Sequence, residues 1–98
     1  MDRYHFRLPV RVTPERHEPV LEIYDVRHAA EFLMALPDER HGKAHQDALG
    51  ACLAAMADSL PVEDARWLLV TFARRAGILS RDTPPPVRRP RESARLPF

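Results

Sequence analysis

The residue best suited to covalent chemistry is the single cysteine, Cys52. A thiolate nucleophile needs a general base within hydrogen-bond reach, and the nearest histidine in the sequence is His45, seven residues earlier. On one helix that separation is a rise of about 10.5 Å, so the two side chains share a face without touching. The other histidines, at positions 5, 17, 28 and 41, approach Cys52 only if the tertiary structure brings them there. We therefore predict that Cys52 is a small core residue and that the chain has no catalytic residues.

His41 and His45 stand four residues apart, a spacing at which two imidazoles on one helix could bind the same metal ion. That helix would have to begin near Asp38, but Gly42 and the polar stretch before it favour a loop. A third ligand would have to come from Asp38, Glu39 or a remote side chain. We predict neither a metal site nor a bound cofactor.

The carboxylates and glycines show no pattern typical of a catalytic site. Isolated glycines do not form a glycine-rich phosphate loop; they are Gly42, Gly50 and Gly77. Four carboxylates flank the first predicted hairpin without a partner pattern, and we interpret them as solvent-facing charge: Glu15, Glu18, Glu22 and Asp25.

Basic residues concentrate at the C-terminal end. Residues 1–79 carry a net charge of −2 and residues 80–98 a net charge of +3, counted from Lys and Arg against Asp and Glu. Arginines at such spacing can contact nucleic-acid phosphates, but no aromatic residue is interleaved among them to stack on bases. The candidate contacts of this tail are Arg88, Arg89, Arg91 and Arg95.

One tryptophan falls outside the apolar stripe of its predicted helix. Trp67 and Val70 lie between Glu63 and Arg74 at helical spacing, away from the stripe. A large aromatic residue there is either covered by the hairpin or offered to a partner, and the sequence leaves both open. We take Trp67, Val70 and Arg74 as a candidate interaction surface.

The whole chain has the composition of one small globular domain, with 98 residues, of which 45% are hydrophobic and 30% charged. Its N-terminal residues lack the apolar stretch of a signal peptide, and no run approaches the roughly 18 apolar residues of a transmembrane helix. A single cysteine forms no internal disulfide and suits a reducing compartment. We expect a cytoplasmic protein that is not embedded in a membrane.

Two short β-branched segments, residues 8–13 and 20–24, predict strands, and the polar, proline-bounded segment between them favours an antiparallel hairpin. A lone hairpin is marginally stable. It must be covered tightly by helices, or two hairpins from two subunits must pair into a four-stranded sheet. Homodimer formation is therefore a hypothesis with a physical cause.

Three helices follow in the sequence. Asp25 is placed as the N-cap of the first, which ends before Pro37. The second covers residues 44 to about 59 and is apolar or small on nearly all sides, as in a central or shared helix. One of its faces carries His45, Ala48, Leu49, Cys52 and Met56, and a second, small-residue face carries Gly50, Ala54 and Ala57.

The third helix begins at Pro61 and ends at Gly77, where Ile78 fits a Schellman motif. Its predicted core stripe is Ala65, Leu68, Leu69, Phe72 and Ala76. From residue 80 the chain is rich in arginine and proline, and we predict a disordered tail.

The order of these features resembles a known family. The chain resembles domain-of-unknown-function family 982, short uncharacterised proteins chiefly from alpha-proteobacteria. The segments that carry the resemblance are Pro9-Val10, Ala29 to Leu33, Gly42-Lys43-Ala44-His45 leading through Ala48 to Cys52, Glu63-Asp64-Ala65-Arg66 and Ala76-Gly77-Ile78. Leu36, where the family has an aromatic residue, and Asp58, where it has a glycine, depart from that pattern. The resemblance implies the hairpin and helices and no known activity.

The predicted fold is therefore α+β: a two-stranded antiparallel hairpin packed on three helices in residues 1–79, with a disordered tail in residues 80–98. The first functional hypothesis is a small non-enzymatic interaction or regulatory module that binds an unknown protein or itself. The alternative is a nucleic-acid-binding accessory protein that uses the basic tail. A thiol enzyme using Cys52 is a third hypothesis.

Overall fold

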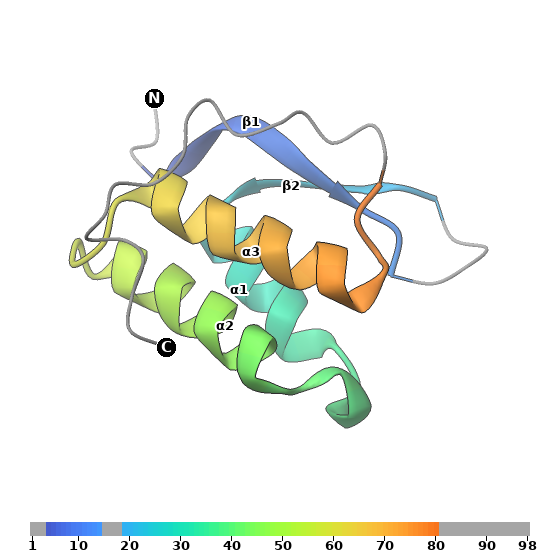
Figure 1. Cartoon of the computed structure of the whole chain (residues 1–98). Helices are drawn as coiled ribbons and strands as arrows, with labels where there is room; N and C mark the ends of the chain where they lie inside the picture. The colour runs from blue at the N-terminus through green and yellow to red at the C-terminus, as the bar shows by residue number, and fades with distance from the viewer. Residues whose placement is uncertain (1–3, 15–18, 81–98) are drawn as a thin grey trace.

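The computed structural model describes residues 4–14 and 19–80 (Figure 1). Its elements are β1 (His5–Val12), β2 (Leu21–Asp25), α1 (Val26–Ala35), a short 3-10 helix η1 (Asp38–Arg40), α2 (Lys43–Met56) and α3 (Val62–Ala76). The two strands pair antiparallel. The predicted α+β fold of a hairpin and three helices is confirmed. The rest of the predicted tail, residues 81–98 with its arginines, lies outside the described residues.

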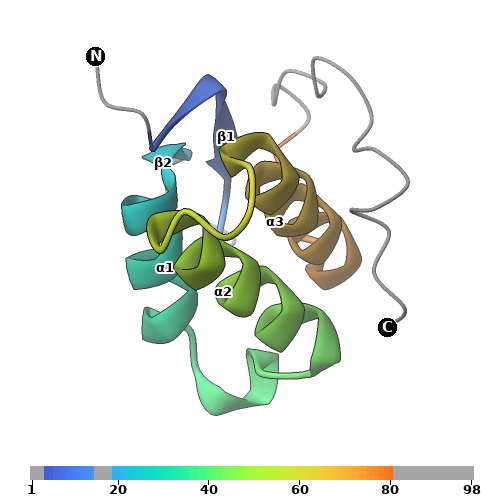
Figure 2. The ribbon, with the colours of Figure 1, turned by 90° about the vertical axis from the view of Figure 1, so that its left-hand side faces the viewer.

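The three helices pack on one face of the hairpin, with α2 between α1 and α3 (Figure 2). Strand β1 lies against α3 and strand β2 against α1. Val10, Val12 and Ile23 point from the hairpin into the core and are completely buried. None of the helices in the described part of the chain is long and apolar enough to cross a membrane.

Strand β1 begins at His5, earlier than the predicted start at residue 8, and a bulge in the hairpin explains why the prediction missed its beginning. His5 pairs with Asp25, but the next paired residue, Val10, lies opposite Ile23. Residues 6–9 therefore face a single residue of β2, Tyr24. The bulge breaks the alternation of inward and outward side chains. Because of this interruption, the first half of β1 does not continue the regular inward and outward alternation on which the prediction of a strand from sequence depends.

Asp25 caps α1 as predicted, because its carboxylate accepts the backbone N–H of His28 at 2.7 Å. Helix α3 ends as predicted in a Schellman motif: Gly77 is left-handed at φ 74°, and the N–H of Ile78 donates to the carbonyl of Ala73 at 3.0 Å.

Helix α2 ends at Met56, three residues before the predicted end. The backbone of Asp58 is left-handed, with φ 62°, and the N–H of Ser59 donates to the carbonyl of Ala54 at 2.8 Å. This is the same helix ending as in α3, with an aspartate in place of the glycine. The difference from the family pattern at residue 58 therefore falls on a position where glycine has a conformational advantage.

The buried face of α2 differs in part from the predicted one. His45, Ala48 and Cys52 are buried as predicted, but Ala51 and Ala55 join them. Leu49 and Met56 are only partly buried. Contact with both α1 and α3 turns the buried sector toward Ala51 and Ala55, and most of the small-residue face stays at the surface.

Candidate functional site

The structure separates the three residues of the predicted interaction surface. Arg74 is exposed and Trp67 is partly exposed on α3. Val70 is only 4% exposed and belongs to the core. Its predicted place on a free surface is wrong, because β1 packs against that side of α3.

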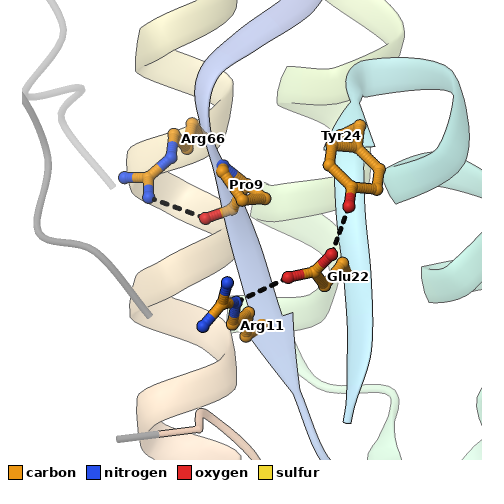
Figure 3. Close-up of polar contacts among 5 residues, drawn as sticks. All are labelled: Pro9, Arg11, Glu22, Tyr24 and Arg66. Carbon is orange, nitrogen blue, oxygen red and sulfur yellow. Dashed lines mark hydrogen bonds and ion pairs between the residues drawn. The ribbon is translucent and has the colours of Figure 1, made fainter. Parts of the chain in front are cut away.

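Arg66, which the sequence offered only as part of the family motif and without a role, joins β1 to α3. Arg66 is only 1% exposed. Its Nε donates to the carbonyl of Leu8 at 2.8 Å, and its Nη2 donates to the carbonyl of Pro9 at 3.2 Å (Figure 3). One turn earlier, a carboxylate oxygen of Glu63 accepts the N–H of Arg7 at 2.9 Å. The bulge turns these backbone groups toward α3, and the two side chains replace the ladder bonds of a regular strand.

Burial lowers the pKa of Arg66, and the Glu63 carboxylate opposes that shift. The sequence signal for Arg66 is its position on the helix. Arg66 lies one helical turn before Leu69 and Val70, three and four residues later, and therefore on the same side of the helix as these apolar residues. An arginine at such a position is either snorkelling or buried with partners, and only the bulge in β1 decides between the two.

Residues that follow α3 close the rest of the β1 edge. Thr13 donates its N–H to the carbonyl of Ile78 at 2.7 Å, and Ser80 donates to the carbonyl of Arg11 at 2.8 Å. Ser80, which the prediction assigned to the disordered tail, is therefore paired with the strand. The outer edge of β1 is covered, so a sheet formed by two hairpins would have to use the edge of β2.

Trp67 lines a half-open groove between the N-terminal half of α2 and α3, with a volume of about 400 Å³. Its apolar lining is Ala44, Trp67, Leu68 and Phe72, and its polar lining is Lys43, Asp47, Thr71 and Arg75. Lys43 and Asp47 form an ion pair at 3.5 Å across one turn of α2. The groove therefore has an apolar floor with charged residues at its border.

His41 and His45 stack beside this groove, with ring centroids 4.0 Å apart. Their Nε2 atoms lie 2.8 Å from the carbonyl of Leu36 and 2.6 Å from that of Leu33. A carbonyl only accepts, so both nitrogens carry hydrogen and donate to the C-terminal end of α1. These nitrogens do not ligate a metal, and no group of three or more metal-binding side chains lies among the described residues.

Cys52 is completely buried. Burial raises the pKa of its thiol to about 12. At neutral pH the thiolate fraction is on the order of 10⁻⁵, so the residue is not prepared as a nucleophile. This finding removes the basis for a thiol enzyme that uses Cys52.

On the outer face of the hairpin, Glu22 lies between two partners (Figure 3). Arg11 contacts its carboxylate at 2.7 Å, and the Tyr24 hydroxyl donates to it. The hydrogen bond from Tyr24 and the Arg11 charge lower the pKa of Glu22, and the same bond raises the pKa of Tyr24. Glu22 and Asp25 thus have structural partners, while Glu15 and Glu18 lie outside the described residues.

The geometry defines a small α+β domain with a groove beside Trp67 and a covered β1 edge. Residues 8–80 match the family described as "Protein of unknown function (DUF982)", and the chain belongs to this family. No curated protein and no solved structure matches the chain.

Proposed function

We propose that this chain is a small non-enzymatic interaction module that binds protein through the groove beside Trp67. The supporting observation is the groove itself, in which the partly exposed side chains of Trp67 and Leu68 lie beside the buried Phe72. Interface hot spots are enriched in tryptophan and arginine, and they lie in apolar pockets with polar borders. Trp67 and Arg75 fit that description.

Two neighbouring residues favour binding over catalysis. The His45 ring lies 5.6 Å from that of Phe72 and supports the groove from below, while its Nε2 is engaged by a backbone carbonyl. Cys52 is a buried thiol with a raised pKa. His45 and Cys52 therefore have structural roles.

Photo-crosslinking in the native host tests this proposal. Thr71, which lines the groove, is replaced by a photoreactive phenylalanine analogue, and the same analogue at Met34 is the matched control. Met34 is 57% exposed on α1. We expect adducts from position 71 that disappear when Trp67→Ala is added and that position 34 does not form. Equal adducts from both positions, or adducts insensitive to Trp67→Ala, would contradict the proposal.

The alternative of nucleic-acid binding depends on Arg88, Arg89, Arg91 and Arg95, which lie outside the described residues. It stays a prediction from the charge asymmetry of the sequence. Its signature is affinity that falls steeply with salt concentration.

A further inference from the structure

We infer that the partner of this groove is a second copy of the chain, packed antiparallel along α3 about a twofold axis. This inference rests on the proposed function and specifies its partner. Two copies related by a twofold axis present the same surface to each other, so that surface must be complementary to itself. The exposed stripe of α3 meets this condition.

The stripe is the side of α3 that the core does not cover, and at its edge Glu63 also accepts the N–H of Arg7 in β1. At 100° per residue its members fall within about one third of the helix circumference. They are partly or fully exposed: Glu63, Asp64, Trp67, Thr71, Arg74 and Arg75. The opposite two thirds of the helix contains its buried residues, Val70 and Arg66 among them.

The order of charges along the stripe is symmetric about its centre. Two acids lie four and three residues before Trp67, and two arginines lie three and four residues after Thr71. When a second copy of the helix runs antiparallel, each acid meets an arginine, and the large Trp67 meets the small Thr71. The opposed pairs, which lie on the same flank of the contact, are Glu63 with the partner's Arg74, Asp64 with the partner's Arg75, and Trp67 with the partner's Thr71.

A parallel arrangement would place acid against acid and arginine against arginine, which is unfavourable. Within residues 4–14 and 19–80, no ion pair engages Arg74 or Arg75. Their positive charge at the end of α3 is therefore compensated only by the helix dipole in this part of the chain. The antiparallel contact supplies each arginine with a carboxylate.

The groove takes part in the same contact. Thr71 lines it beside Leu68 and Phe72, and the antiparallel arrangement brings the partner's Trp67 to Thr71. Each tryptophan therefore lies at the mouth of the other copy's groove, where its indole covers apolar surface. The twofold axis passes between the two helices at the level of Leu69.

A charge-swap experiment on the full chain tests this arrangement. Arg75→Asp alone and Asp64→Arg alone each place like charges opposite each other twice in a homodimer. A mixture of the two variants restores both pairs in a heterodimer. The dissociation constant is measured by sedimentation and by the emission of Trp67, the only tryptophan of the chain.

We expect self-association of the wild type, weakened at least about tenfold in each single variant and restored in the mixture to within about threefold of the wild type. Arg27→Asp on the exposed side of α1 is the matched control and should retain wild-type association. Circular dichroism verifies folding. If Asp64→Arg does not fold, Thr71→Arg provides the second test, because it places two cations at the axis and should abolish association.

Three results would overturn the inference: a wild type that stays monomeric over about a hundredfold range of concentration, a mixture no better than the single variants, or a Thr71→Arg protein that associates like the wild type. A monomer whose position 71 still crosslinks another protein in a Trp67-dependent way would retain the proposed function and refute only the self-association. Loss of both signals would refute both.

Discussion

The two long sides of α3 carry similar residues and have opposite roles. On the β1 side, Arg66 and Val70 are buried, and the arginine donates to the carbonyls of residues 8 and 9. On the α2 side, Trp67 and Arg75 border an open groove. On one side of α3 an arginine and an apolar residue are therefore buried in the contact with β1, and on the other side an arginine and an apolar residue form an accessible surface. The neighbouring element decides which role they have, because β1 covers the first side and nothing among the described residues fills the second.

The largest expected effect comes from opening the closed side. Arg66→Ala leaves two partly buried carbonyls without their donor, and each such loss costs about 1 to 3 kcal/mol. We expect the free energy of unfolding to fall by about 3 kcal/mol in urea titrations. Arg27→Ala, at an exposed arginine on α1 away from the proposed contact, is the matched control and should change stability by less than about 0.5 kcal/mol. Equal stabilities of the two variants would contradict the stabilising role of Arg66 in the contact between α3 and β1.

The second prediction compares neighbours on the two sides. Val70→Ala removes buried methyl groups and should cost about 2 kcal/mol of stability without changing the self-association of the folded protein. Trp67→Ala removes a much larger side chain but should cost no more stability than Val70→Ala, and it should abolish self-association. Chemical denaturation and sedimentation measure the two properties. If Val70→Ala changed the self-association of the folded protein, the two sides of α3 would not have the separate roles that we assign to them.

A third prediction concerns Cys52, which is completely buried in the core between α2 and its neighbours. Burial raises the pKa of Cys52 from 9.0 to about 12. Between these values the unfolded chain releases a proton that the folded chain keeps, so stability is complete below pH 9 and is lost as the pH rises. We expect a loss of about 1.4 kcal/mol per pH unit from this residue.

Cys52→Ala separates this loss from the titration of lysine and tyrosine. The difference in unfolding free energy between wild type and variant should shrink as the pH rises above 9. A difference that stays constant with pH would show that solvent reaches the thiol in the folded state.

The smallest effect concerns the ends of the two helices that form the groove. Both end with a left-handed residue, Asp58 after α2 and Gly77 after α3. Asp58→Gly should stabilise the protein by about 0.5 kcal/mol, whereas Gly77→Ala should destabilise it by about 1 kcal/mol. Thermal unfolding measures both shifts. A destabilising Asp58→Gly would mean that the Asp58 side chain, which accepts from the Tyr4 hydroxyl at 3.4 Å, contributes more than its backbone strain costs.

Several features of the fold could be predicted because their causes are local. The Asp25 cap, the proline start of α3 and the Gly77 ending depend on residues within one turn of each other. The hairpin follows from two β-branched segments with a polar connection. The early end of α2 was missed, since a left-handed aspartate gives a weaker sequence signal than a glycine.

The site was only half predictable for the same reason. Helical spacing identified Trp67 and Arg74 but placed Val70 beside them, because it could not show which element covers each side of α3. That cover depends on Arg66 and Leu8, which lie 58 residues apart in sequence. Local preferences of the chain therefore determine where each element begins and ends. The choice of the closed and open sides of α3 belongs to the tertiary structure, because a bulge in β1 and a buried arginine must meet before either side is defined.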